Sequence, residues 1–348
     1  MMAGARLVDR YRGLICDLDG VIYRGLEAVP HAVEALTLRG KTTRLVLATN
    51  NASRSAAEVA GQVTRLGLEV TPAQVVTSAE AGAAHLSSIL EPGATVLAVG
   101  GSGVIEALAA AGLRPVRTAS GVRAVLQGYG RNVTAGDLAE ASYAVAAGAT
   151  WIAANRDATL PTEHGTAPGN GTLVDAVAVA TGRQPLVVGK PEAPLYTLGV
   201  ERLRTTPDEV LAVGDRLDTD ILGAVNAGLD SLWVLTGVDD LASFVTSDVR
   251  ALPTFVGLDL RALLRPAPRV TREAGWWVCG GLRLRLDLTR GNQDLLQVVA
   301  DGAPQTREHY RDAALSAGFR ALARAREAPD SDDDRLGDAA IELASRLA

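Results

Sequence analysis

Two aspartates separated by one residue follow an apolar run near the start of the chain. The stretch LICDLDGVIY, residues 14–23, places Asp17 and Asp19 at the end of a segment typical of a buried strand. An ionised carboxylate is a ready nucleophile at neutral pH, and a second one close by can move a proton. This spacing therefore predicts that Asp17 attacks a substrate and that Asp19 acts as the general acid and base.

Polar residues also end other apolar runs that lie far apart in the sequence. These residues are Thr49, Asn50, Asn51, Lys190 and Asp215. Ligands of open α/β sheets bind beyond the carboxyl ends of the strands, so we expect these side chains to contribute to one site. A lysine, a threonine and backbone amides close to a helix start suit a phosphoryl group.

Crowded carboxylates also predict a cation. Such groups repel one another, so either one of them takes up a proton or a cation joins them. The candidate ligands Asp17, Asp19 and Asp215 offer only oxygen atoms, which favours a hard ion. Because so few ligands leave water in place on the ion, Mg²⁺ is favoured over Ca²⁺.

The elements that must position these residues alternate along the chain. Short apolar runs end in Gly, Asn or Asp and have helical patterns between them, which is typical of parallel strands buried on both faces. Capping-box spacing at 55–58, 71–74 and 206–209 predicts helix starts, whereas Gly67 and Gly228 predict helix ends. We therefore expect an α/β fold.

Composition excludes several other classes of protein. The chain has 348 residues, is 47% hydrophobic and carries a net charge of −6, which suits two or three globular domains and gives no basic footprint for nucleic acid. The longest charge-free run, 141–155, is shorter than the roughly 20 residues of a membrane helix, and the first residues contain no signal-like apolar region. We expect a cytoplasmic protein without membrane insertion, in which Cys16 and Cys279 are buried reduced thiols.

Four ordered motifs resemble those of the haloacid dehalogenase superfamily. They are DLDGV (17–21), ATNN (48–51), GKP (189–191) and GDRLDTDI (214–221). Their exact form is similar to the branch of 4-nitrophenylphosphatases and phosphoglycolate phosphatases, which carries a large α/β cap between the second and third motifs. Within this branch, the extra C-terminal segment resembles that of glycerol-3-phosphate phosphatases with such an extension.

The resemblance implies a domain organisation. A parallel-sheet phosphatase core would comprise residues 1–80 and 186–262, an inserted α/β cap 81–185, and a small α+β C-terminal block 263–348. The expected reaction is the Mg²⁺-dependent hydrolysis of a small phosphate monoester, with glycerol 3-phosphate as the first candidate and 2-phosphoglycolate as the next. A regulatory or scaffolding protein in which the C-terminal block carries the main role is the alternative from another functional class.

The resemblance also assigns roles to residues. Mg²⁺ would be held by the carboxylates of Asp17 and Asp215 and by the backbone carbonyl of Asp19. The expected phosphate ligands are Thr49, Asn50, Asn51 and Lys190. Asp220 would act behind the metal ligands by fixing Lys190 or a metal-bound water, and Asp218 would lie there too or cap the following helix.

The polar loop 154–171 lies in the middle of the expected cap. Four of its residues are candidates for reading the part of the substrate beyond the phosphate: Asn155, Arg156, Asp157 and His164. An ordinary solvated loop is an equally good interpretation of this composition.

The C-terminal block is less distinctive. The stretch WWVCGGLRLRLDL predicts two strands with Leu282, Leu284, Leu286 and Leu288 on one face, followed by three helical patterns. This order resembles a fragment of an N-acetyltransferase fold but lacks the Gly-rich pyrophosphate-binding turn. We predict a docking or dimerisation element, so that the chain forms a homo-oligomer through this block or the cap. The acidic stretch 328–335 is expected to be a solvated turn that caps the last helix.

Overall fold

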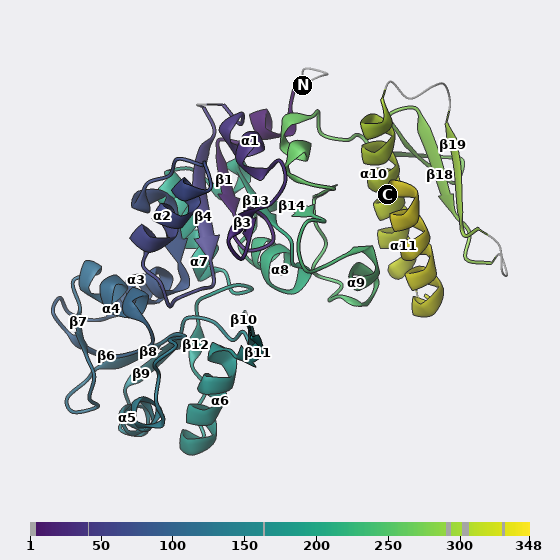
Figure 1. Ribbon diagram of the computed structural model, residues 1–348. Helices are drawn as coiled ribbons and strands as arrows, with labels where there is room; N and C mark the ends of the chain where they lie inside the picture. The colour runs from purple at the N-terminus through teal and green to yellow at the C-terminus, as the bar shows by residue number, and fades with distance from the viewer. Residues whose placement is uncertain (1–4, 41, 163, 290–293, 301–305, 329–330) are drawn as a thin grey trace. The chain divides into compact units, whose positions relative to one another are not determined.

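Figure 1 shows the computed structural model, which describes residues 5–40, 42–162, 164–289, 294–300, 306–328 and 331–348. The chain divides into two compact units. Unit 1 comprises Met1–Arg44 and Thr205–Ala348, and unit 2 comprises Leu45–Arg204. The division into core, cap and C-terminal block, with boundaries at 80/81, 185/186 and 262/263, stays a prediction.

The sheet of unit 1 carries two of the catalytic candidates. Its strands lie in the order β15-β14-β13-β1 and are parallel. They are β1 (Gly13–Cys16), β13 (Val210–Gly214), β14 (Asp230–Val234) and β15 (Phe255–Gly257). Because β1 and β13 are buried throughout, their sequences are continuous apolar runs. The register pairs Cys16 with Val213, so Asp17 and Asp215 follow neighbouring strands at the same edge of the sheet.

Short helices and a hairpin complete this part of unit 1. They are η1 (Leu7–Arg10), β2 (Tyr23–Arg24), β3 (Glu27–Ala28), α1 (Ala32–Thr37), η3 (Pro207–Glu209), η4 (Leu217–Ile221), α8 (Leu222–Asn226), α9 (Leu241–Thr246) and η5 (Leu260–Leu264). The helix start predicted at Thr206 is only one 3₁₀ turn, because the buried strand β13 begins directly after it. The predicted helix end at Gly228 is confirmed by its positive φ of 70° after α8.

The C-terminal block differs in part from its prediction. Its described residues form the antiparallel strands β16 (Thr271–Glu273), β17 (Trp276–Cys279), β18 (Leu282–Leu286) and β19 (Leu296–Ala300), and the helices α10 (Arg307–Arg326) and α11 (Asp333–Leu347). The two strands predicted in WWVCGGLRLRLDL are confirmed as β17 and β18. Of the three helical patterns predicted after them, the described residues contain two helices, because the apolar segment at 296–300 pairs with β18 as a strand. The expected α+β composition of the block is confirmed.

Helices of the block itself cover the apolar face of this sheet. Leu282 and Leu284 are buried in one apolar cluster with residues of α10 and α11. Asp332 caps α11 by accepting a hydrogen bond from the backbone of Arg335, as expected for the acidic stretch, of which 329 and 330 lie outside the described residues. In Figure 1, α10 and α11 lie between this sheet and α9.

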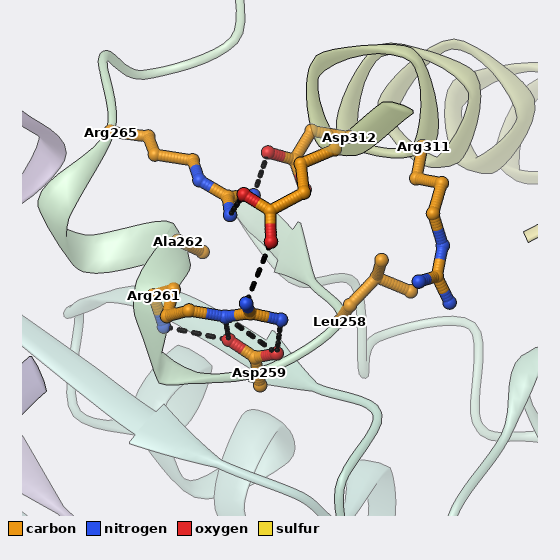
Figure 2. Close-up of a pocket in the computed structure, with 8 residues that line it drawn as sticks. Leu258, Asp259, Arg261, Ala262, Arg265, Arg311 and Asp312 are labelled. Atoms are coloured by element: carbon orange, nitrogen blue, oxygen red, sulfur yellow. Dashed lines mark hydrogen bonds and ion pairs between the residues drawn. The ribbon is translucent and has the colours of Figure 1, made fainter. Parts of the chain in front are cut away.

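Ion pairs join α10 to Arg261 and Arg265, which lie on either side of the predicted start of the block (Figure 2). Glu308 on α10 forms ion pairs with Arg261 at 2.8 Å and with Arg265 at 2.9 Å, and Arg265 also forms an ion pair with Asp312. Burial raises the pKa of Asp312. These residues line a cavity of about 10 Å³, which has room for about one water molecule. The ion pairs therefore hold α10 in place, and the cavity between these residues is too small for a metabolite.

Unit 2 contains a second parallel sheet. Its strands lie in the order β12-β9-β8-β6-β7, and outside this sheet β4 and β5 pair in parallel. The strands of the sheet and the pair are β4 (Arg44–Thr49), β5 (Val75–Thr77), β6 (Thr95–Val99), β7 (Arg114–Val116), β8 (Ala124–Gln127), β9 (Thr150–Ala153) and β12 (Leu186–Val187). An antiparallel hairpin of β10 (Thr159–Thr162) and β11 (Gly165–Pro168) follows β9.

The helices of unit 2 test the remaining boundary predictions. They are α2 (Ala56–Arg65), η2 (Pro72–Gln74), α3 (Ser78–Ile89), α4 (Ser102–Ala110), α5 (Ala135–Ala146), α6 (Asn170–Thr181) and α7 (Pro194–Leu203). Ser55 and Glu58 form the predicted capping box of α2, and Gly67 follows this helix with φ of 99°. Thr71 begins one 3₁₀ turn because β5 starts immediately after it. The predicted α/β fold is confirmed.

Within the described ranges, every helix is too short or too polar to cross a bilayer.

Candidate active site

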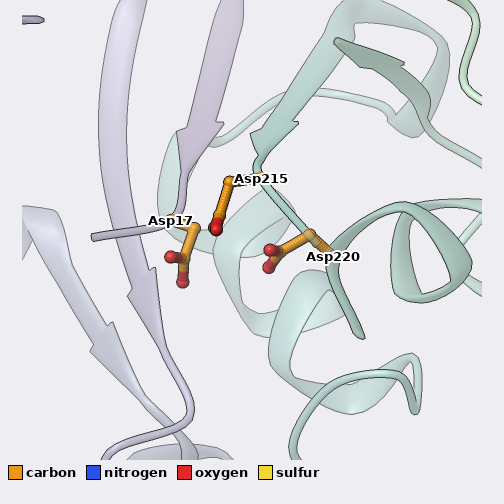
Figure 3. Close-up of side chains that lie close together, drawn as sticks. All are labelled: Asp17, Asp215 and Asp220. Atoms are coloured by element: carbon orange, nitrogen blue, oxygen red, sulfur yellow. The ribbon is translucent and has the colours of Figure 1, made fainter. Parts of the chain in front are cut away.

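Three aspartates of unit 1 converge beyond the carboxyl ends of β1 and β13 (Figure 3). Asp17, Asp215 and Asp220 each offer a carboxylate oxygen, and these oxygens all lie within 4.8 Å of one another. Asp17 is partly buried, whereas the exposed fractions of Asp215 and Asp220 are only 1% and 2%. Such crowding of buried anions is unfavourable unless a cation or a proton compensates for it.

Hydrogen bonds to backbone groups position these three residues. The Asp17 amide donates to Val213 O at 2.8 Å, which ties the end of β1 to β13. Asp215 Oδ2 accepts a hydrogen bond from the Val238 amide at 2.7 Å, and Asp220 Oδ2 accepts one from the Arg216 amide at 3.1 Å. Asp220 lies on η4, a single π-helical turn, a feature that is frequent at functional sites.

Glycines make room for the buried carboxylates. A Cβ atom on Gly20 or Gly237 would overlap the carboxylate of Asp215, and one on Gly214 would overlap the side chain of Asp220. Gly20 also has φ of 83°, a conformation in which most other residues are strained. The chain thus reserves space around both carboxylates.

This donor set fits Mg²⁺. Three clustered carboxylates offer hard oxygen ligands in the number that leaves positions for water and substrate. Asp17 and Asp215 were predicted as metal ligands, and the structure brings them together. Asp220, predicted to act behind them, lies in the same cluster.

The two other predicted aspartates lie differently. Asp19 is exposed, and the turn after it is closed by a hydrogen bond from Gly20 N to Tyr23 O at 2.8 Å. Asp218 forms a two-point ion pair with Arg216, at 3.1 Å and 2.8 Å. An exposed Asp19 is accessible to a leaving group and to water, whereas Asp218 supports the conformation of the loop.

In unit 2, Asn50 holds the backbone of Lys190 from both sides. Asn50 Oδ1 accepts from Lys190 N at 2.8 Å, and Asn50 Nδ2 donates to Lys190 O at 3.0 Å and to Asp157 Oδ1 at 3.3 Å. Lys190 is only 3% exposed, and its ammonium donates to Ala48 O at 3.3 Å. The amide of Asn50 is therefore engaged in placing Lys190.

Thr49 and Asn51 shape the turn after β4. Thr49 is 4% exposed, and its hydroxyl accepts a hydrogen bond from the Asn51 amide at 3.0 Å. Asn51 Oδ1 accepts from the amide and the hydroxyl of Ser53 at 2.9 Å and 2.6 Å. The Asn51 side chain thus stabilises the turn that leads into α2.

Family models match both segments of the chain that carry these residues. Residues 14–114 match a model described as haloacid dehalogenase-like hydrolase, and residues 187–263 match a second one described as HAD hydrolase-like. A D-glycerol 3-phosphate phosphatase of Mycobacterium tuberculosis is 44% identical over 294 residues, which cover 83% of this chain and 82% of the relative. The chain belongs to the haloacid dehalogenase-like hydrolases.

Solved structures agree with this membership. A glycerol phosphate phosphatase of M. tuberculosis in complex with magnesium matches with a TM-score of 0.80 and 38% identity, over 99% of both chains. The p-nitrophenyl phosphatase of Archaeoglobus fulgidus matches with a TM-score of 0.68 and 29% identity, over 98% of its own length but only 73% of this chain. The predicted superfamily is confirmed, and about a quarter of this hydrolase has no counterpart in the shorter structure.

Two of the four candidates in the loop 154–171 of this hydrolase contact the Asn50 segment. Asn155 is 3% exposed and donates to Asn50 O at 2.7 Å, and Asp157 accepts from the Asn50 amide. Arg156 instead pairs with Asp175 at 2.6 Å and donates to Gln184 at 2.9 Å. His164 is exposed at the tip of the β10–β11 hairpin. Substrate recognition by these four residues stays a prediction.

The sequence reasoning missed Asp239. Its Oδ2 accepts a hydrogen bond from the Leu217 amide at 2.7 Å, which links the loop after β14 to η4. Burial raises the pKa of Asp239, and the negative charges of Asp218 and Asp220 add to this effect. The pair of aspartates after the run SLWVLTG was the available signal, although its neighbour Asp240 is an ordinary cap of α9.

Proposed function

We propose that this hydrolase is a Mg²⁺-dependent phosphatase of small phosphate monoesters, with glycerol 3-phosphate as its main substrate. The cluster of Asp17, Asp215 and Asp220 carries the proposal, because three crowded carboxylates fit a hard cation beside a nucleophile. The similar proteins named above support the substrate and the metal. A curated relative is a D-glycerol 3-phosphate phosphatase, and a solved glycerol phosphate phosphatase is in complex with magnesium.

In the first step, a carboxylate oxygen of Asp17 attacks the phosphorus atom of the ester. A bond forms between this oxygen and phosphorus while the bond to the alcohol oxygen breaks. Asp19, in its protonated form, donates its proton to the departing oxygen, so that a neutral alcohol leaves. The products are the free alcohol and an aspartyl-phosphate on Asp17.

In the second step, Asp19 takes a proton from a water molecule whose oxygen attacks the same phosphorus atom. The bond between phosphorus and the Asp17 oxygen breaks, which returns the carboxylate and releases inorganic phosphate. Asp17, Asp215 and the backbone carbonyl of Asp19 would hold Mg²⁺, which would supply positive charge that offsets the negative charge of the phosphoryl group. Asp220 is a further candidate ligand because it lies in the same cluster.

The residues of unit 2 would bind the phosphate. We propose that Lys190 supplies positive charge and that the Thr49 hydroxyl and the backbone amide of Asn50 donate hydrogen bonds. The backbone amide of Asn51 orients the Thr49 hydroxyl by donating to its oxygen. The side chains of both asparagines have a supporting role. The side-chain amide of Asn50 forms hydrogen bonds with the backbone of Lys190, and the side-chain oxygen of Asn51 accepts one from the backbone of Ser53.

Two other substrates deserve a place in the test. An acid sugar phosphatase of Staphylococcus haemolyticus is 35% identical over 74% of this chain and 97% of its own length, which favours sugar phosphates. 2-Phosphoglycolate remains the second expectation from the sequence.

A purely regulatory or scaffolding role is disfavoured, because a scaffold has no need of the aspartate cluster. Glycerol 3-phosphate as substrate would place the enzyme in glycerophospholipid metabolism, and a cytoplasmic location and a homo-oligomeric state are parts of the same proposal.

The test is a phosphate-release assay over a panel of esters, each with Mg²⁺ and with EDTA. The panel contains glycerol 3-phosphate, 2-phosphoglycolate, p-nitrophenyl phosphate and several sugar phosphates. We expect the highest kcat/KM for glycerol 3-phosphate, and no turnover in EDTA. A higher value for a sugar phosphate would contradict the assigned substrate, and release unaffected by chelation would contradict the metal-dependent mechanism.

A further inference from the structure

Trp233 connects the aspartate cluster to the interior of unit 1. It lies on β14, opposite Gly214 of β13, and is fully buried. Its indole Nε1 donates a hydrogen bond to the backbone carbonyl of Asp215 at 3.0 Å. The orientation of the indole therefore constrains the peptide that carries the Asp215 carboxylate.

The ring of Trp233 packs against two phenylalanines. The ring centroids of Trp233 and Phe244 on α9 lie 6.1 Å apart, and those of Trp233 and Phe319 on α10 lie 6.3 Å apart. Phe244 and Phe319 contact each other with a centroid separation of 4.8 Å. Since Phe319 belongs to the C-terminal block, that block directly contacts the residue that holds Asp215.

A second connection runs through α9. Arg326 of α10 donates to Phe244 O, to Ser247 Oγ at 2.9 Å and to Asp248 O at 3.2 Å, and its guanidinium lies 4.3 Å from the Phe244 ring centroid. It thus caps the carboxyl end of α9 with a cation, which is the favourable sign there. The loop that leads into α9 contains the Val238 amide, the donor to Asp215 Oδ2.

The apolar residues on either side of Asp220 also share a cluster with residues of the C-terminal block. Leu217 and Ile221, at the two ends of η4, are each 1% exposed and belong to the apolar cluster that contains Phe319 and Leu322 of α10. The turn that carries Asp220 therefore rests on a core that is completed by the C-terminal helices.

We propose that the C-terminal block is a positioning element for the metal site, in which Trp233 and Phe319 are the positioning residues. Groups behind metal ligands orient them, and their loss typically lowers metal affinity by about 10- to 100-fold. The proposal rests on the assignment of Asp215 as a metal ligand in the proposed function. It gives the C-terminal quarter of the chain a role in catalysis without any residue of its own touching the substrate.

Binding of MgCl₂ to the full-length protein, measured by isothermal titration calorimetry without substrate, tests the coupling. Trp233→Phe keeps an aromatic ring but removes the donor to Asp215 O. Phe319→Leu keeps burial but removes the ring contact. We expect each variant to raise the Kd for Mg²⁺ about tenfold, and saturating MgCl₂ to restore most of kcat while the concentration for half-maximal activity stays raised.

Leu284→Ala is the matched control. Leu284 is fully buried in the same cluster, but it lies on β18, on the sheet side of α10. We expect this variant to lower Tm and to leave the Kd for Mg²⁺ within about twofold of wild type. An unchanged Kd in Trp233→Phe or Phe319→Leu, or a rise in Leu284→Ala as large as theirs, would refute the coupling.

The experiment also separates this inference from the proposed function. Absence of Mg²⁺ binding by the wild-type protein would overturn the metal site itself, and the coupling with it. Wild-type binding that is abolished by Asp215→Asn, together with unchanged affinity in Trp233→Phe and Phe319→Leu, would overturn only the role of the C-terminal block.

Discussion

Replacement of Asp17 by asparagine separates the catalytic role of this residue from its effect on stability. The variant keeps the shape of the side chain but loses the nucleophile, so we expect phosphate release to fall by about 10⁴-fold or more. In the metal-free protein the substitution also removes repulsion. Carboxylate oxygens within 4.8 Å of one another repel by at least about 3.5 kcal/mol per pair at an effective dielectric constant of about 20.

The net gain in stability should be smaller than this repulsion. Asp17 is partly exposed, so solvent screens its interactions with Asp215 and Asp220. We therefore expect Asp17→Asn to raise the free energy of unfolding by about 1–2 kcal/mol in EDTA. Because the variant has also lost one anionic ligand, adding Mg²⁺ should stabilise it less than it stabilises the wild-type protein.

Urea unfolding in EDTA and in MgCl₂, followed by far-UV circular dichroism, measures both effects. The same protein samples are then assayed for phosphate release. Asp218→Asn is the control, since Asp218 pairs with Arg216 outside the cluster. If Asp17→Asn released phosphate at a rate comparable to wild type, Asp17 would not be the nucleophile. A loss of stability in EDTA would show that the carboxylates do not repel as the geometry requires.

Four other predictions follow from the same structure. Asp215→Ala should raise the MgCl₂ concentration for half-maximal activity by about tenfold or more. If this concentration were unchanged, Asp215 would be excluded as a metal ligand. His164→Ala should reduce kcat/KM for glycerol 3-phosphate more than for p-nitrophenyl phosphate, whereas an equal fall would indicate general damage to the hairpin. Burial raises the pKa of Cys16 to about 12 and that of Cys279 to about 11, so both thiols are protonated at pH 8. Iodoacetamide should therefore label them only after the protein unfolds, and rapid labelling of the native protein would contradict this prediction. Deletion of 266–348 should lower solubility and raise the Mg²⁺ requirement, and a soluble truncated protein with wild-type Mg²⁺ affinity would argue against both effects.

The aspartate cluster could be predicted because its residues follow short-range rules. Asp17 and Asp215 directly follow buried strands, and the parallel arrangement of β1 and β13 brings strand ends together whatever the sequence between them. Asp220 was placed behind them by the resemblance of GDRLDTDI (214–221) to a family motif. Its presence among the clustered carboxylates depends on the π-helical turn at Leu217–Ile221, which the sequence pattern does not reveal.

Other features depend on contacts that local patterns cannot specify. Capping boxes at Thr71 and Thr206 predicted helices, yet each yields one 3₁₀ turn because a buried strand follows at once. The segment Leu296–Ala300 has an apolar pattern too short to distinguish strand from helix, and its pairing with β18 decides the outcome. Both errors come from tertiary contacts that override a local preference.

The C-terminal block illustrates why such contacts carry functional information. Every residue of α10 from Ala313 to Phe319 is buried, so this helix lacks the single apolar face of a helix that covers only one surface. Gly318 allows close approach of α11, since a Cβ atom there would crowd Leu343, and Phe319 reaches Trp233. A helix packed on several sides transmits changes in its own packing to each neighbour. Since one of these neighbours holds the carbonyl of Asp215, the sequence of α10 is constrained by the metal site as well as by the block to which it belongs.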